Sequence, residues 1–157
     1  MTSDRQVLVK IKRLNNKAKI PQYSHPGDVG ADLVSIIDYT LQPLERYAVA
    51  TGLSAEIPIG YELQVRPRSG LALKHGITVL NTPGTIDAGY RGEIKVILIN
   101  LGSEPFKIIQ GQKIAQLVIA PVILGQFQEV DELSSSVRGS DGFGSTGVTY
   151  VEVKGDG

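Results

Sequence analysis

One acid of this sequence, Asp87, lies inside a turn-rich segment that leads directly into an apolar strand. The segment reads "GTIDAGYRGE" at residues 84–93, and Tyr90 and Arg91 follow the acid within one turn. A second acid, Asp32, stands beside a glycine in "VGADLVS". A carboxylate is ionised at neutral pH and can accept a proton from a water that is held in place. Acids are also common in turns because they hydrogen-bond the backbone there, so a structural role is open for each.

Two arginines separated by a proline, in "RPRSGLA" at residues 66–72, end an expected strand and begin an expected helix. The guanidinium of Arg68, the hydroxyl of Ser69 and the free N–H groups of a helix start all suit a phosphate group. Gly70 would let a ligand approach the main chain closely. The structural alternative is an arginine in a surface salt bridge followed by a serine that caps the helix.

A glycine-rich segment near the C-terminus, "GSDGFGST" at residues 139–146, resembles the spacing of a phosphate-binding P-loop. Ser145 stands where the lysine should be, and no strand precedes nor helix follows, so a true P-loop is not expected. The segment could still surround phosphates with backbone N–H groups, with Arg138 adding charge and Phe143 stacking on a base. The alternative is a flexible Gly/Ser linker.

The composition favours one soluble domain. The chain has 157 residues, 16 basic and 16 acidic side chains and no cysteine. The charge balance argues against a general nucleic-acid or membrane-surface binder, and a chain without cysteine forms no disulfide or thiolate metal site. His25 and His75 lack ligand spacing and are expected in ordinary loop or surface roles. Because no signal core or membrane-spanning run is present, we expect a soluble, cytoplasmic protein.

Hydrophobic residues recur mainly with a period of two, which predicts an all-β chain. A short helix is expected at residues 69–75, with Ser69 as its cap. Both faces of residues 94–99 are apolar, which favours a sandwich or barrel with strands buried on both sides, where an apolar subunit interface could cover one of them. The expected strands are residues 7–12, 46–53, 61–67, 93–100, 106–110 and 113–124.

The amino-acid composition of the chain changes near its C-terminus, where Ser, Gly and charged residues dominate. Such a stretch buries too little apolar area to offset the entropy of ordering it. We therefore expect a β-barrel domain at residues 1–133 and a flexible arm at residues 134–157.

Five segments together resemble, in order and spacing, the motifs of the trimeric dUTP diphosphatase (dUTPase) family. They are "GADL" (30–33), "RPRSGLA" (66–72), "GTIDAGYRGE" (84–93), "GQKIAQL" (111–117) and "RGSDGFGSTG" (138–147). The resemblance implies a jelly-roll-like β fold and a homotrimer with shared active sites. It also implies Mg²⁺-dependent hydrolysis of dUTP to dUMP and pyrophosphate, which provides dUMP for thymidylate synthesis and keeps uracil out of DNA.

The resemblance also implies a role for each motif residue. Asp87 would be the catalytic base, Tyr90 would exclude a 2′-hydroxyl, and the main chain of a hairpin with the Asn81 side chain would read uracil. Asp32 would hold Mg²⁺ through a water, and Arg91 would support the hairpin or the trimer. The arm would close over the active site, with Arg138, Ser145 and Thr146 at the β and γ phosphates and Phe143 over the base. The residues expected to bind substrate are Arg68, Ser69, Gly70, Asn81, Gly84, Thr85, Ile86, Asp87, Tyr90, Lys95, Gln116, Arg138, Phe143, Gly144, Ser145 and Thr146.

Two other functions stay open at this point. A dCTP deaminase resembles this family in fold, but it needs a glutamate in the strand after the hairpin. That position is Ile97 here, and an isoleucine cannot transfer a proton. The second alternative is a catalytically silent β-trimer that binds a nucleotide or a protein partner, against which the retained Asp87 and complete arm motif weigh.

Overall fold

The computed structural model describes residues 6–150 of the chain. The chain divides into two compact units, Met1–Ile123 and Leu124–Gly157. The regular elements of the described residues all lie in the first unit. They are β1 (Lys10–Arg13), β2 (Ala31–Val34), β3 (Tyr39–Leu41), β4 (Arg46–Ala50), β5 (Leu53–Glu56), β6 (Tyr61–Arg66), α1 (Ser69–His75), β7 (Ile77–Val79), β8 (Gly84–Ile86), β9 (Lys95–Asn100), β10 (Phe106–Ile108) and β11 (Lys113–Pro121).

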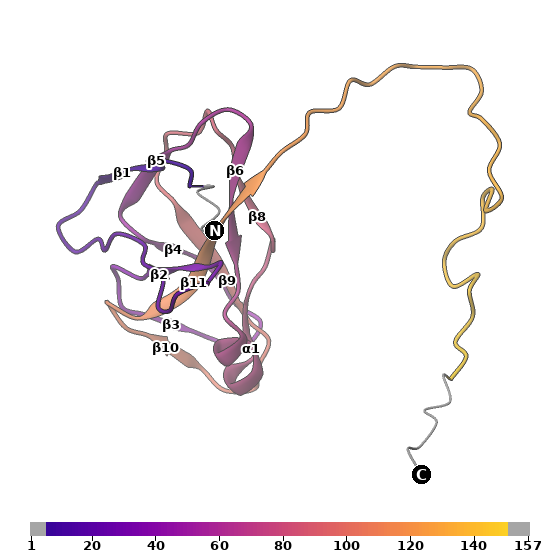
Figure 1. The fold of residues 1–157 in the computed structure, drawn as a ribbon. Coiled ribbons are helices and arrows are strands. Elements are labelled where there is room, and N and C mark those ends of the chain that lie inside the picture. The colour runs from indigo at the N-terminus through magenta and orange to yellow at the C-terminus, as the bar shows by residue number, and fades with distance from the viewer. Residues whose placement is uncertain (1–5, 151–157) are drawn as a thin grey trace, which may run out of the picture. The chain divides into compact units, whose positions relative to one another are not determined.

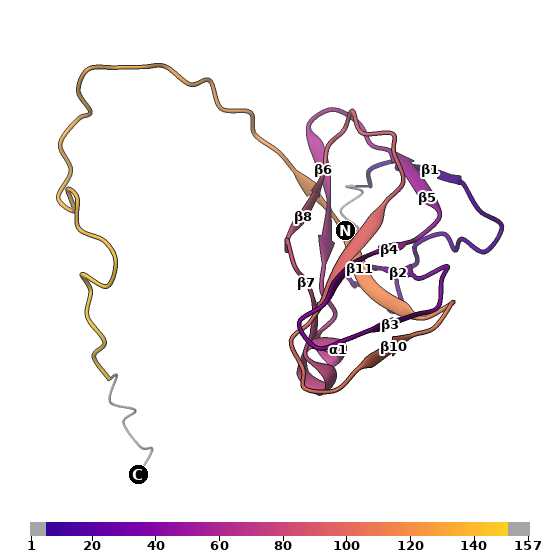
Figure 2. The same ribbon diagram turned by 180° about the vertical axis from the view of Figure 1, so that it is seen from behind.

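The strands form small antiparallel sheets, which confirms the predicted all-β, jelly-roll-like fold with one short helix. The strand orders are β1-β5, β10-β3, β2-β11-β6-β8 and β4-β9-β7. Helix α1 and the β3–β10 pair lie at one end of the first unit (Figure 1). The view from behind shows the same arrangement, with β6 leading into that end (Figure 2). No helix of the described residues is long and apolar enough to cross a membrane.

The core takes side chains from all of these sheets. Burying each such aliphatic side chain stabilises the fold by about 1.5–3 kcal/mol. The largest fully buried side chains are Leu33, Leu41, Val49, Leu53, Leu63, Ile77, Val79, Ile94, Val96, Leu98, Ile108 and Ile114.

Strand β9 buries only one of its faces within a single chain. Val96 and Leu98 are buried, whereas Ile97 and Ile99 on the other face are half-buried. The prediction that both faces of residues 94–99 are buried is therefore wrong for one chain. The prediction differs from the structure because an apolar pattern shows which side chains avoid water, but not whether the same chain or another subunit covers them.

Helix α1 ends where the chain reverses into β7. Gly76 has φ 67° and its N–H bonds the carbonyl of Ala72, which is the left-handed ending that glycine favours. A Cβ at Gly76 would also lie 2.6 Å from the backbone nitrogen of Gly102. The end of α1 is thus packed directly against the loop after β9.

In the second unit, the described residues 124–150 contain no helix or strand. Successive tight turns shape the glycine-rich part: the N–H of Ser145 bonds the carbonyl of Gly142 at 3.1 Å, and that of Gly147 bonds Gly144 at 2.8 Å. Residues 151–157 lie outside the described part of the chain. The predicted boundary at residue 133 and the closing of an arm over the site stay predictions.

Candidate active site

The residues predicted to bind phosphate line one cavity of the first unit. Arg68, Ser69, Gly70 and Gln116 border a space of about 580 Å³, and Asp32 lies in the same wall. Arg68, Ser69 and Gly70 stand at the start of α1, whereas Gln116 and Asp32 stand opposite each other on the paired strands β11 and β2. The structure therefore brings together four predicted substrate residues and the predicted metal-water residue.

Strand β11 is the element that aligns this cavity. Gln116 stands opposite Asp32 of β2 on one side and Arg66 of β6 on the other. Its amide Nε2 donates a hydrogen bond to the carbonyl of Pro67 at 2.9 Å, just before α1. A Cβ at Gly30 would lie 2.0 Å from Oε1 of Gln116, so any other residue there would displace this side chain from its present position.

The start of α1 differs from the sequence prediction. Arg68, and not Ser69, occupies the N-cap position, with φ −99° and ψ 128°, and no side chain caps the helix. The prediction of Ser69 as the cap is wrong, because the chain enters helical geometry one residue earlier than that role requires. Ser69 is instead the first helical residue, with its exposed side chain in the cavity wall.

The carboxylate of Asp32 is surrounded by donors and positive charge. Lys113 Nζ lies 2.6 Å from its Oδ2 and Arg68 Nε lies 3.7 Å from its Oδ1. Burial acts to raise the pKa of Asp32. The hydrogen bonds from Lys113 and Ser24 act to lower it. The charges of Arg68 and Lys113 add to them, so the pKa of Asp32 lies below its usual value.

Several residues of this cavity were not predicted from the sequence to belong to a functional site. Ser24 lies in a loop before β2. The N–H of Asp32 donates a hydrogen bond to the carbonyl of Gln22 at 2.9 Å, and this bond holds the loop against β2. His25 and His75 both line the cavity, although they were expected only in ordinary loop or surface roles. No spacing signal could have found them, because the loop and the helix end meet only in the folded chain.

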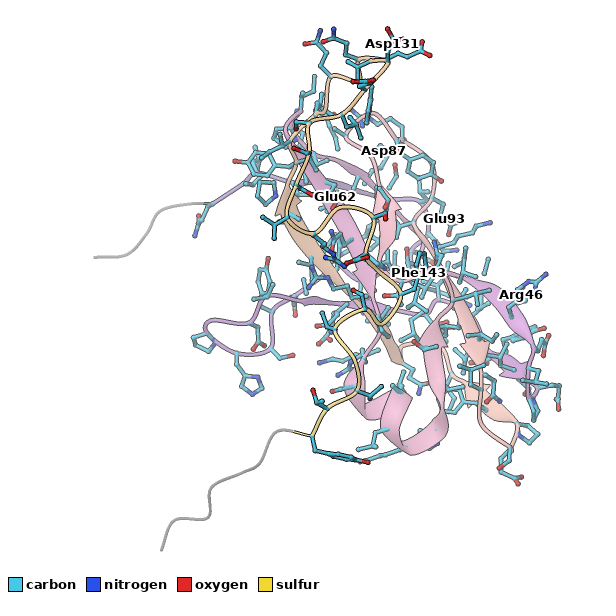
Figure 3. The ribbon with its side chains drawn as sticks, turned by 90° about the vertical axis from the view of Figure 1, so that its right-hand side faces the viewer. Arg46, Glu62, Asp87, Glu93, Asp131 and Phe143 are labelled. Carbon is cyan, nitrogen blue, oxygen red and sulfur yellow. The ribbon has the colours of Figure 1, made fainter. Side chains whose placement is uncertain are left out.

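The residues predicted to carry the chemistry line a second cavity, of about 500 Å³. Asp87 and Glu93 both belong to the segment that leads from β8 to β9 (Figure 3). The hydroxyl of Tyr90 donates a hydrogen bond to the carbonyl of Glu93 at 3.0 Å, which fixes the tyrosine ring within the segment that contains Asp87. The predicted residues in this lining are Thr85, Ile86, Asp87, Tyr90 and Lys95.

The segment at residues 84–93 is not a regular β-hairpin, which corrects that part of the prediction. Strand β8 pairs with β6, whereas β9 pairs with β4 and β7, so the segment connects two sheets. Arg91 supports this connection as predicted, because its guanidinium donates to the carbonyls of Ala88 at 2.7 Å and Tyr90 at 3.0 Å. The side chain of Arg91 therefore stabilises the turn that contains Asp87.

Asn81 and Gly84 flank the second cavity without lining it. Asn81 is exposed and precedes the cis peptide bond between Thr82 and Pro83. A Cβ at Gly84 would lie 3.5 Å from Nδ2 of Asn81, so the amide reaches the start of β8. Asn81 and Gly84, which are predicted to contact uracil, are therefore neighbours at the start of β8.

The two cavities have no lining residue in common. One holds the predicted phosphate residues, and the other holds Asp87 and Tyr90. In a single chain, the predicted phosphate residues and the predicted catalytic residue therefore line separate cavities.

The remaining predicted residues belong to the second unit. Arg138 donates from Nε to the carbonyl of Asp141 at 2.8 Å. Phe143 has φ 49° and is fully exposed. Gly144, Ser145 and Thr146 follow it in the turns described above. Their predicted contacts with phosphate stay predictions.

The acids and histidines of the described residues form no group of three or more that could hold a metal ion. A cation at Asp32 would therefore need most of its ligands from water or from a substrate. Mg²⁺ is the common cation that keeps several waters and is bound by one or two carboxylates with substrate phosphates.

The chain is similar to known proteins over most of its length. Residues 16–147 match the model of the family described as dUTPase. A deoxyuridine 5'-triphosphate nucleotidohydrolase of Clostridium novyi is 59% identical over 138 residues, which cover 88% of this chain and 97% of that protein.

Solved structures agree with the sequence comparison. The dUTPase of Staphylococcus bacteriophage 80alpha with dUpNHpp superposes with a TM-score of 0.80 and 30% identity, covering 90% of this chain and 99% of that one. A variant dUTPase of phage phi11 of S. aureus, described with a structural Mg(II) ion, has a TM-score of 0.74 and 26% identity, covering 80% and 97%. From the family match and the identity to its members, this chain belongs to the dUTPase family.

Proposed function

We infer that this protein hydrolyses dUTP to dUMP and pyrophosphate. The observation that carries this inference is the 59% identity to a deoxyuridine 5'-triphosphate nucleotidohydrolase over nearly the whole of that relative. The cavity that holds Asp87 and Tyr90 supports it. The direct test is release of pyrophosphate from dUTP by the purified chain, compared with dCTP, dTTP and UTP. Equal rates for all four nucleotides, or none for dUTP, would contradict the inference.

The carboxylate of Asp87 acts on a water molecule in this proposal. It accepts a proton as the water oxygen bonds to the α-phosphorus, and the bond from that phosphorus to the bridging oxygen breaks. Pyrophosphate leaves with the electron pair of that bond. Because phosphoryl transfer offers side chains little covalent work, most of the acceleration comes from positioning and charge neutralisation.

Base and sugar recognition belong to the edge beside Asp87. The Asn81 amide and the main chain of β8 would pair with the polar edge of uracil. Cytosine reverses the donor and acceptor pattern there, and an unpaired buried polar group costs about 1–3 kcal/mol. Gly84, Thr85, Ile86 and Lys95 are assigned to the same binding edge.

The phosphate cavity fits a triphosphate that brings Mg²⁺ with it. Arg68, Ser69, Gly70 and Gln116 supply the charge and donors for phosphate oxygens. Asp32 is the one acid assigned to the metal, through a water, and the small number of acids suits a cation ligated mainly by phosphate and water. When bound, Mg²⁺ would neutralise charge on the phosphate oxygens.

A homotrimer with shared sites would join the two partial sites of different subunits. Two observations support it: the cavities lie apart in one chain, and Ile97 and Ile99 form an apolar face that one chain leaves half-buried. Arg138, Phe143, Gly144, Ser145 and Thr146 of the arm would close over the assembled site. Arm residues would then order the phosphates and exclude water.

Mixing two inactive variants tests the sharing. We expect Arg68→Ala and Asp87→Asn each to be inactive alone, and their mixture to regain part of the activity after subunit exchange. In a mixed trimer, some sites combine an intact Arg68 with an intact Asp87. Light scattering should give three times the chain mass of 16.9 kDa. A trimer whose mixture stays inactive would place both partial sites of one reaction within one subunit.

Tyr90 is expected to select deoxyribose. Its ring is held by the bond to Glu93, and a 2′-hydroxyl packed against it would have no space and no partner. Tyr90→Ala should lower the preference for dUTP over UTP, measured as the ratio of kcat/KM values, by about tenfold or more, since burying an unpaired hydroxyl costs on the order of 1–3 kcal/mol. Tyr90→Phe keeps the ring and should keep most of the preference. An unchanged ratio in Tyr90→Ala would remove the sugar-selecting role.

The two alternatives predict other outcomes of the same assays. A silent β-trimer would bind dUpNHpp without releasing pyrophosphate from dUTP. A deaminase would release ammonia from dCTP, but Ile97 offers no proton. Glu93, the other acid in that cavity, accepts a bond from the N–H of Gly52 at 3.0 Å. A cytoplasmic location and the absence of nucleic-acid partners stay predictions.

A further inference from the structure

Strand β11 contains a bulge next to Asp32. Lys113 stands opposite Val34 of β2, where a regular ladder would place Ile114. Residues two apart on a strand share a face, so Val34 and Asp32 share one, and the bulge brings Lys113 onto that face. Ile114 turns into the core instead, where it is 1% exposed. Without the bulge, Lys113 would point away from the acid.

Lys113 and Ser24 together hold one oxygen of the Asp32 carboxylate. Lys113 Nζ lies 2.6 Å from Oδ2, and Ser24 Oγ donates to the same oxygen at 2.9 Å. Lys113 Nζ also donates to Ser24 Oγ at 3.3 Å, which closes a ring of three contacts. The other oxygen, Oδ1, has Arg68 Nε at 3.7 Å, beyond hydrogen-bond distance.

The two cations beside Asp32 line different hollows, which adjoin each other at Ser24, His25 and Asp32. Arg68 lines the phosphate cavity, whereas Lys113 lines a separate hollow of about 740 Å³ with Arg13 and Lys19. Asp32 lines both hollows, so its carboxylate is part of the wall between them. Lys113 is absent from the lining of the phosphate cavity, so it contacts Asp32 from outside that cavity.

We propose that Lys113 is a positioning residue that, with Ser24, fixes Oδ2 of Asp32 so that Oδ1 keeps one direction toward the phosphate cavity. The torsion that turns a carboxylate is broad, so its direction must come from outside contacts. The inference rests on the proposed function, in which Asp32 holds a water of Mg²⁺. Residues that orient a metal-binding group from behind typically contribute about 10–100-fold in metal affinity or activity.

The test is calorimetric titration of dUpNHpp into the full chain over a range of Mg²⁺ concentrations. Lys113→Met keeps an unbranched side chain that is shorter by one atom and removes its donors. We expect the Mg²⁺ concentration for half-maximal dUpNHpp affinity to rise by about tenfold or more. A role through charge alone predicts the opposite sign, because a less neutralised Asp32 would attract Mg²⁺ more strongly. An unchanged or lowered Mg²⁺ requirement in folded Lys113→Met would overturn the proposal.

Three further variants keep the test decisive. Ser24→Ala should raise the Mg²⁺ requirement in the same direction, and its effect should not add to that of Lys113→Met, since both act on one oxygen. Lys113→Arg, which keeps a charged donor, should recover part of the affinity. Lys10→Met removes a surface ion pair of 2.9 Å with Glu56, outside both cavities, and should change nothing.

Separate outcomes identify which inference fails. If the unchanged chain does not hydrolyse dUTP, the proposed function is wrong. If it does, and Lys113→Met has the melting temperature and the Mg²⁺ dependence of the unchanged chain, only the positioning role is wrong. Should Lys113→Met not fold, Ser24→Ala decides, and an unchanged Mg²⁺ requirement in that variant refutes the role.

Discussion

Asp87→Asn is expected to bind dUpNHpp as the unchanged chain does and to lose about a hundredfold or more in kcat. The amide keeps the shape of the carboxylate and one acceptor oxygen, but it cannot accept a proton as a base. The turn should be unaffected, because it closes through the backbone: the N–H of Tyr90 bonds the carbonyl of residue 87 at 3.0 Å. Steady-state pyrophosphate release gives kcat, and calorimetry with dUpNHpp gives the affinity.

Asp38→Asn is the matched control for loss of one negative charge. Asp38 is exposed, lies outside both cavities and accepts a bond from the N–H of Gln110 at 2.7 Å, which an asparagine oxygen can replace. Its kcat should equal that of the unchanged chain. Normal hydrolysis by Asp87→Asn would take the base role away from this acid, and loss of dUpNHpp binding would assign it to binding instead.

Removing the chain from Val137 onward should abolish most activity while leaving the fold intact. The buried hydrophobic core of the described residues ends at Val118, so the removed segment supplies no core area and the melting temperature should barely change. Turnover depends on the segment if Arg138 and the turns of residues 139–147 order the phosphates and exclude water. A chain that ends at Gly147 keeps those turns and should retain most of the activity.

Proteolysis reports the closing of this arm directly. Ordering a glycine-rich segment costs conformational entropy, so it should be ordered only when a ligand contributes new contacts. Trypsin should cleave after Arg138 readily in the free protein and slowly with saturating dUpNHpp and Mg²⁺. Full activity of the truncated chain, or cleavage that ignores the ligand, would leave residues 134–147 as a linker.

Local patterns predicted the longer elements well. The helix at residues 69–75 was predicted with the bounds that the structure has, because the preceding proline and the glycine at position 76 delimit it. The predicted strands at 61–67, 93–100 and 113–124 correspond to β6, β9 and β11. Strands β2, β3, β5, β7 and β8 had no predicted range of their own, because three or four residues are too few to establish a period of two.

The candidate site needed the folded chain for its arrangement. Composition and spacing indicated Asp87 and Arg68, but not that they line separate cavities, because sequence spacing carries no tertiary distance. Lys113 was overlooked since its direction depends on a bulge, which shifts the alternation of faces by one residue. The N-cap assignment of Ser69 failed on a one-residue shift that a preference for serine cannot resolve.

The close contact between Gly30 and Gln116 limits how this protein can change over evolutionary time. Any other side chain at position 30 would place its Cβ 2.0 Å from Oε1 and 3.0 Å from Cβ of Gln116. That glutamine could retreat only by giving up its bond to Pro67. At Gly89, by contrast, an added Cβ would meet nothing within 4 Å. A substitution at position 30 would therefore act through a displaced Gln116 side chain, although the glycine itself has no side chain to offer a substrate.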